Sequence, residues 1–142
     1  MPTFEATTVI AAPPAAVWET LLATERWTHW DPQLERVDGR LVDGGRLEIR
    51  VKDNPRPFRL RVSSWEPHRR IVLTGGMPLG LFTGTRTYTL AGGGAGTTVT
   101  VRETYTGPLA GVIGKSIPDL APSFDSFVSG LRRDAEGQDQ HR

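Results

Sequence analysis

Residues 82–106 read FTGTRTYTLAGGGAGTTVTVRETYT, and they set the pattern for much of the chain. In the first half, every second residue from Thr83 to Thr89 is a threonine, so the threonines share one side of an extended strand. The opposite side carries Phe82, Gly84, Arg86, Tyr88 and Leu90. Such alternation predicts a β-strand with one buried face, and it places an arginine on that face.

The glycine-rich segment 91–96 joins this strand to a second one. A phosphate-binding glycine loop should open a helix, so we interpret the segment as a turn. The apolar side of the second strand carries Val99, Val101, Glu103 and Tyr105. If Leu90 lies opposite Val99, the apolar faces of both strands coincide, as one buried side of a hairpin requires. This register predicts that Arg86 meets Glu103, because directly opposite side chains on one face interact.

Five further segments have the composition and spacing of strands. They are residues 3–11, 34–39, 46–53, 58–65 and 69–75. Most connections from residue 34 onward are short and rich in glycine and proline, and connections of that length favour antiparallel neighbours. The chain therefore predicts a seven-stranded antiparallel sheet.

Helical spacing occurs in three places. Pro13 and Pro14 suit the start of a helix over 15–23, and a second short helix over 24–30 ends at Asp31-Pro32. Near the end of the chain, apolar residues follow the spacing of a long amphipathic helix, namely Leu120, Phe124, Phe127, Val128 and Leu131. We expect Asp119 to cap this helix, Pro122 to lie in its first turn, and a break near Pro118 to separate it from a helical turn within 109–117.

Length and composition limit the possible classes of protein. A chain of 142 residues suits a single domain, which we place at 1–135, with a polar disordered tail at 136–142. The formal net charge of +1 does not favour nucleic acid or an anionic membrane as partner. With no cysteine, no secretory signal pattern and no apolar stretch of membrane-spanning length, we expect a soluble, cytoplasmic protein.

The order of one strand, two short helices, six strands and a long C-terminal helix resembles the START-like superfamily, also called SRPBCC. The residues that carry the resemblance are VIAAPPAAVWETL at 9–21, the W..W.P pattern from Trp27 to Pro32, DGGRLEIRV at 43–51, WEPHRRIVL at 65–73 and GTTVTVRETYTG at 96–107, with the closing LRRDAE. The resemblance implies an α+β helix-grip fold, in which a curved sheet wraps around the C-terminal helix and leaves a cavity. Members of this superfamily bind hydrophobic or amphipathic molecules there, and they share no invariant catalytic residues.

Two interpretations of Arg86 stand side by side. It forms either a structural ion pair with Glu103 or a polar anchor for a ligand in the cavity wall. Ligand sites combine an apolar lining with a few convergent polar groups, which Arg86, Glu103, Tyr88 and Tyr105 would supply. A buried ion pair gives little stability over an apolar pair of similar size. Stability alone therefore does not explain the pair, and this raises the question of a functional role.

Several other residues complete the candidate cavity wall and mouth. They are Trp27, Trp30, Trp65, Phe82 and Phe124, and for the tryptophans a place in the core is the alternative. The loop 75–84 is either a lid or an ordinary connection. Asp31 would serve as a general acid only if burial raised its pKa, and an exposed aspartate that ends a helix is the expected interpretation. The three histidines lie in separate segments, so we predict no metal site, and no motif indicates a cofactor.

These observations leave three functional hypotheses. The first is a binding or carrier protein for a lipid, polyketide or aromatic metabolite. The second is an enzyme similar to polyketide cyclases and dehydratases, in which Arg86 polarises a carbonyl group and Glu103 or a tyrosine moves the proton. The third is a protein-interaction module like the members of the superfamily that activate a chaperone. The sequence is compatible with a monomer or a homodimer.

Overall fold

The protein is described from a computed structural model, which places residues 3–52, 57–76, 78–94, 96–113 and 121–140. The strands are β1 Thr3–Ile10, β2 Leu34–Gly39, β3 Arg46–Val51, β4 Phe58–Glu66, β5 Arg70–Gly76, β6 Thr83–Gly93 and β7 Gly96–Thr106. The helices are α1 Pro14–Leu22, α2 Trp27–Trp30, α3 Ala110–Ile113 and α4 Ala121–Gln140, with 3₁₀ turns η1 Thr24–Arg26 and η2 Pro78–Gly80.

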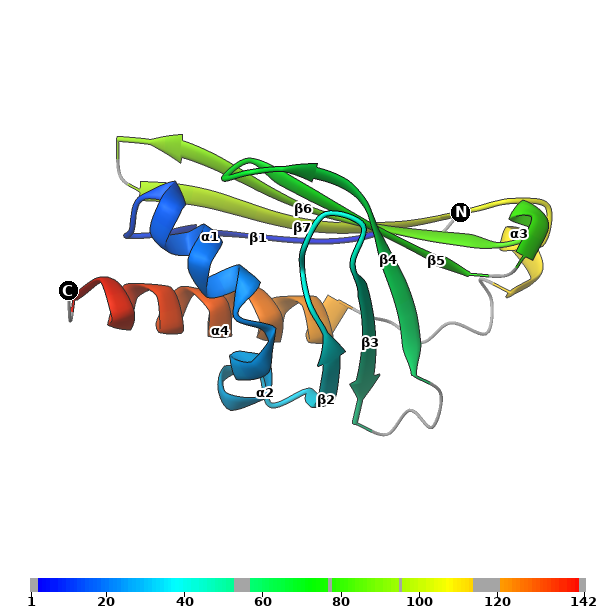
Figure 1. The fold of residues 1–142 in the computed structure, drawn as a ribbon, viewed down its shortest axis with the longest axis horizontal. Coiled ribbons are helices and arrows are strands. Elements are labelled where there is room, and N and C mark those ends of the chain that lie inside the picture. Colours follow the sequence, from blue (N-terminus) through cyan, green and yellow to red (C-terminus); the bar gives the residue numbers. More distant parts are fainter. Residues whose placement is uncertain (1–2, 53–56, 77, 95, 114–120, 141–142) are drawn as a thin grey trace.

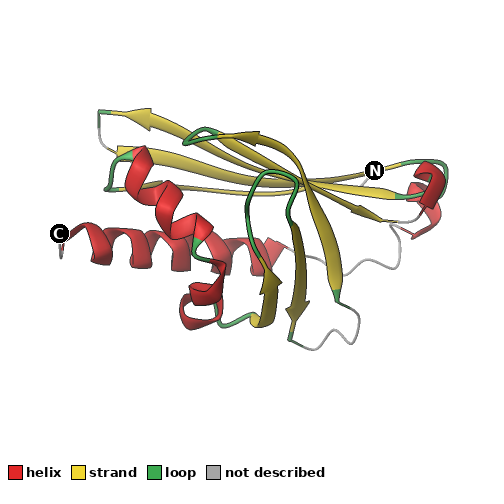
Figure 2. Cartoon of the chain, viewed as in Figure 1, coloured by secondary structure: helices red, strands yellow, loops and turns green. Residues whose placement is uncertain are grey.

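All seven strands form one antiparallel sheet in the order β1-β7-β6-β5-β4-β3-β2. The first two strands in the sequence therefore lie at opposite edges of the sheet, and α1 and α2 make the connection between them. The long helix α4 packs along the inner face of the curled sheet, while α3 lies at the other end of the molecule beside the turn between β5 and β6 (Figures 1 and 2). This is the α+β architecture expected from the sequence.

The hairpin of β6 and β7 has the predicted register. Leu90 pairs with Val99, Arg86 with Glu103 and Gly84 with Tyr105. The two strands extend further into the glycine-rich segment than expected, because Gly93 still pairs with Gly96. The register thus follows from burial: the apolar side of each strand faces the core and the threonine side faces outward.

The core lies between the sheet and the helices. Helix α4 contributes one buried stripe with helical spacing, Phe124, Phe127, Val128, Leu131 and Ala135. Val17 and Leu21 of α1 are fully buried and lie four residues apart on one face of that helix. The amphipathic spacing of both helices is thereby explained by a single shared core.

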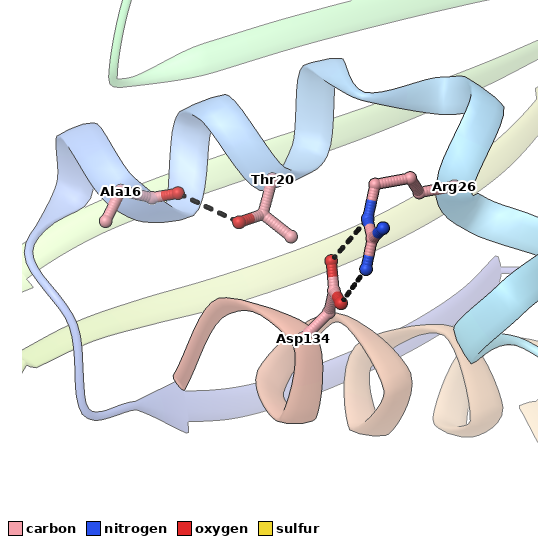
Figure 3. Close-up of polar contacts among 4 residues, drawn as sticks. All are labelled: Ala16, Thr20, Arg26 and Asp134. Atoms are coloured by element: carbon pink, nitrogen blue, oxygen red, sulfur yellow. Dashed lines mark hydrogen bonds and ion pairs between the residues drawn. The ribbon is translucent and has the colours of Figure 1, made fainter. Parts of the chain in front are cut away.

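Helix α4 is also attached to the N-terminal part of the chain by polar contacts. The guanidinium of Arg26 donates to both carboxylate oxygens of Asp134, over 2.8 and 3.4 Å (Figure 3). The same view shows a hydrogen bond within α1, from the hydroxyl of Thr20 to the carbonyl of Ala16. Gly130 of α4 lies against the backbone carbonyl of Trp30, where a Cβ atom would be 2.2 Å from the oxygen. Glycine therefore allows α4 to approach α2 more closely than any other residue would.

Two boundaries differ from the expectations. Helix α4 continues to Gln140, past residue 135 where the domain was expected to end. The segment 24–30 forms a 3₁₀ turn and a single α-helical turn in place of one helix. The expected cap at Asp119 and the break near Pro118 fall outside the described residues.

Candidate functional site

The ion pair between Arg86 and Glu103 lies on the concave face of the sheet, where Arg86 contacts Phe124 of α4. The Nη2 atom of Arg86 is 3.0 Å from Oε2 of Glu103, and the side chains are 10% and 4% exposed. Tyr105 donates from its hydroxyl to the same oxygen over 3.2 Å. Burial is the largest influence and opposes the positive charge of Arg86, but Glu103 and Tyr88 together outweigh it and raise the pKa of the guanidinium. Arg86 therefore stays charged in this site.

The two tyrosines of the site keep their hydroxyl protons. Burial raises the pKa of Tyr105, and the charge of Glu103 raises it further. Burial likewise raises the pKa of Tyr88, against the opposing influence of Arg86. Both tyrosines thus serve as neutral hydrogen-bonding groups near neutral pH.

One donor of Arg86 has no acceptor. Its Nε atom is buried and makes no hydrogen bond within the described part of the chain. The Cζ atom of Arg86 lies over the ring of Phe124, 5.1 Å from its centroid, close enough for a cation–π contact. Arg86 is therefore fixed by Glu103 on one side and Phe124 on another, with one N–H group left to bind something else.

Asp31 is the residue that the sequence analysis assigned wrongly. It is only 1% exposed, although an exposed helix end was expected. Helix α2 is a single turn packed against α4, so the residue that ends it points into the interior, where Ser126 of α4 donates to Oδ1 over 2.6 Å. The backbone N–H of Gln33 donates to the same oxygen over 3.0 Å. Burial raises the pKa of Asp31 in spite of these hydrogen bonds.

These polar groups border a cavity between the sheet and α4. Its volume is about 30 Å³, and it is lined by Asp31, Leu34, Ile49, Val51, Phe58, Arg86, Tyr88, Val101, Ser123, Phe124 and Phe127. A cavity of this size accommodates a water-sized group with polar partners, whereas pockets for drug-sized ligands usually measure roughly 300–1,000 Å³. Leu34, Val51 and Phe58 are only partly buried, so the apolar side of the cavity leads toward the surface.

The structure brings together some of the candidate site residues and separates others. Arg86, Tyr88 and Phe124 line the cavity, and Glu103 and Tyr105 lie behind Arg86. Phe82 stacks on Tyr105 with ring centroids 5.4 Å apart, outside the cavity lining. Polar and aromatic groups from β6, β7 and α4 thus form one continuous cluster.

The tryptophans occupy the core. Trp27 is fully buried, its ring meets that of Phe127 edge to face, and its indole nitrogen donates to the carbonyl of Leu21. Trp30 is also buried and packs on Phe127. Trp65 contacts Trp18 and takes no part in the cavity lining. Of the three tryptophan candidates, none reaches the cavity directly.

The loop between β5 and β6 lies beside α3, at the end of the molecule away from the C-terminus of α4 (Figure 1). Leu81 accepts a backbone hydrogen bond from Leu109, which precedes α3. Leu79 has a positive φ of 63° and is 95% exposed. A role of the segment 75–84 as a lid stays a prediction.

A second hollow, of about 490 Å³, is formed by β2 to β5. Arg46 and Glu48 contribute to it, and both flank the buried Leu47, so they point away from the core. Glu48 also pairs with Arg59 over 3.5 Å. Because its lining has charges of both signs and no aromatic ring, this hollow does not suit a hydrophobic ligand.

Within the part of the chain that the structure places, no cluster of three or more acidic or histidine side chains could hold a metal ion. In the same residues, no helix is long and apolar enough to cross a bilayer.

Comparison with known proteins confirms the resemblance inferred from the sequence. Residues 1–136 match the model of a family described as polyketide cyclase/dehydrase and lipid transport. A search of curated proteins found no match.

Solved structures agree on the fold. The hypothetical protein jhp0584 from Helicobacter pylori superposes with a TM-score of 0.75 at 13% identity, covering 94% of this chain and 88% of that one. TTHA0849 from Thermus thermophilus gives 0.72 at 22% identity, with 96% and 99% covered. The di-domain ARO/CYC StfQ from the steffimycin biosynthetic pathway gives 0.73 at 15% identity, with 97% and 52% covered. At these identities the likeness concerns the fold alone.

Proposed function

Because the chain belongs to the polyketide cyclase/dehydrase and lipid transport family, we propose that it binds a hydrophobic or amphipathic small molecule between the sheet and α4. The ligand would be a lipid, a polyketide or an aromatic metabolite. Its polar end would lie at Arg86 and its apolar part along Leu34, Val51 and Phe58. A cytoplasmic location and a monomeric or homodimeric state stay predictions.

The observation that supports this proposal is a charged residue in the lining of a mainly apolar cavity: Arg86 borders it, and the Nε–H of Arg86 has no acceptor among the described residues. A buried donor without an acceptor costs free energy, and a ligand oxygen would recover it. The cavity of about 30 Å³ admits only the polar end of such a ligand. Binding of the apolar part therefore requires the cavity to widen.

Native mass spectrometry of the purified protein, followed by extraction under denaturing conditions, tests the proposal. We expect a reproducible excess of mass that is released on unfolding. The double variant Arg86→Gln with Glu103→Gln keeps two hydrogen-bonding side chains without charge, so it should fold and retain less ligand. A protein free of ligand that also shows no thermal shift with lipids or aromatic compounds would contradict the proposal.

A polyketide cyclase- or dehydratase-like enzyme is the second candidate. Glu103 contacts both Arg86 and Tyr105, so a proton could move between a bound ligand and this cluster. The single change Glu103→Gln separates the two functions. An enzyme would lose turnover and keep ligand binding, whereas a carrier has no turnover to lose.

A further inference from the structure

We propose that Asp31 is a second polar contact for the ligand, so that the cavity selects molecules with a hydrogen-bond acceptor for Arg86 and a hydroxyl donor for Asp31. This inference rests on the proposed binding function and adds the chemical class of the ligand. The class is a hydroxylated carbonyl compound with an apolar remainder.

The first argument is the way in which Asp31 is held. Both of its hydrogen bonds, from the hydroxyl of Ser126 and the N–H of Gln33, reach Oδ1. No described residue donates to Oδ2, although Asp31 as a whole is 1% exposed and borders the cavity. The carboxylate is thus fixed in orientation by one oxygen, and the other is free to accept a hydrogen bond from a ligand.

The second argument is that the cavity has complementary polar groups on different elements. Arg86 on β6 offers an unused donor, and Asp31 after α2 offers an unused acceptor. Tyr88 lines the same cavity as both residues. A ligand group in the cavity therefore borders both a residue with an unused donor and a residue with an unused acceptor.

The third argument concerns which ligand groups fit beside Asp31. Oδ2 of Asp31 has no donor among the described residues, and a ligand hydroxyl group can supply one. A ligand carboxylate at the same place would be repelled by the like charge. Asp31 therefore favours a hydroxyl, whereas Arg86 favours a carbonyl or carboxylate oxygen.

The test uses medium-chain methyl ketones with a hydroxyl on the carbon next to the carbonyl group or one carbon further, and the parent ketones without it. Their dissociation constants are measured by calorimetry for the wild-type protein and for Asp31→Asn. Asparagine keeps an oxygen for Ser126 and Gln33, but it offers an NH₂ donor where Oδ2 was an acceptor. Asp125→Asn is the matched control, because Asp125 is an exposed aspartate on α4.

We expect at least one hydroxyketone to bind the wild-type protein about tenfold or more tightly than its parent ketone, as a hydrogen bond to a charged group allows. Asp31→Asn should remove this preference and leave the parent ketones unchanged, and Asp125→Asn should change neither. Equal binding of both series to the wild-type protein would overturn the role of Asp31 while leaving the proposed function intact. Failure of every ketone to bind would count against the proposed function itself.

A second measurement covers the case in which Asp31→Asn does not fold. The carboxyl ¹³C resonance of Asp31 in the wild-type protein should shift with the hydroxyketones and stay unchanged with the parent ketones. An identical response to both series would overturn the inference.

Discussion

At the scale of single residues, Arg86 is the centre of the polar cluster on the buried face of the sheet. Its guanidinium contacts Glu103 and the ring of Phe124, and Gly84 leaves the space that the ring of Tyr105 occupies, with a virtual Cβ atom 3.3 Å from that ring. A charged group is accepted here because Glu103 lies directly opposite on β7.

Removing one partner of this pair should be costly. Arg86→Ala leaves Glu103 buried without its counter-charge, and we expect the free energy of unfolding to fall by about 3–5 kcal/mol. The double variant Arg86→Met with Glu103→Leu replaces the pair by apolar side chains and should recover most of that loss. Urea denaturation of the three proteins measures the difference. A negligible effect of Arg86→Ala would mean that the pair is solvated in solution.

The site shows where sequence reasoning succeeds and where it stops. Arg86 and Glu103 could be paired in advance, because strand alternation fixes faces and a hairpin couples two registers. Asp31 could not be assigned, since a one-turn helix ending in Asp-Pro has the same local pattern whether its end is exposed or buried. Its burial depends on Ser126, which lies far away in the sequence.

At the scale of elements, the contact between α2 and α4 depends on a residue without a side chain. Gly130 lies on α4 where any Cβ atom would meet the backbone carbonyl of Trp30 at 2.2 Å. Backbone atoms cannot rotate away as a side chain can, so α4 itself would have to shift. That shift would displace Ser126 from Asp31 and alter the cavity.

Two alanine substitutions on the same helix test this packing. Gly130→Ala should destabilise the protein by about 1–3 kcal/mol, the usual cost of overpacking. At Gly137 a new methyl group would meet no neighbouring atom within 4 Å. Because alanine loses less conformational freedom than glycine in a helix, Gly137→Ala should stabilise the protein by roughly 0.5–1 kcal/mol. Thermal unfolding of both variants gives the comparison. If both glycines responded alike, the close approach of α4 to α2 would not exist in solution.

At the scale of the whole molecule, the last part of α4 is attached to the residue that follows β1. The backbone N–H of Ala11, just after β1, donates to Oε2 of Glu136 over 3.0 Å, and Arg132 donates to the same oxygen over 3.1 Å. The hydrogen bond from Ala11 is the main reason why the pKa of Glu136 is lowered. Helix α4 therefore holds the end of β1 in place through a carboxylate.

The lowered pKa sets the direction of a pH effect. A carboxyl group whose pKa is lower in the folded state stabilises the fold above its unfolded pKa, about 4.3 for glutamate, and loses that contribution as the pH falls. Glu136→Gln should thus be less stable than the wild-type protein near neutral pH, and the two should converge in acid. Glu5→Gln is the control, because Glu5 lies 3.9 Å from Arg102 on the surface. A constant difference between Glu136→Gln and the wild-type protein at every pH would contradict the assignment.

Much of the global arrangement could be predicted from the sequence, since alternation, short turns and one amphipathic helix allow few other folds. The size of the cavity could not be predicted, because it depends on how Phe124 and Phe127 pack against β2 to β4. The extent of α4 was also missed: its polar end, from Glu136 onward, looks like a tail until the contact with Ala11 is known.

The position of β1 at the edge of the sheet has a consequence for biosynthesis. Its one neighbour is β7, with Thr3 opposite Thr104. A ribosome adds about 5–20 residues per second, so β1 emerges first and stays without its partner for several seconds. The other strands can pair with their predecessors as they appear, but the nascent chain keeps one exposed strand until β7 is complete. Synthesis of β7, the last strand in the sequence, therefore sets the earliest time at which the sheet can be completed.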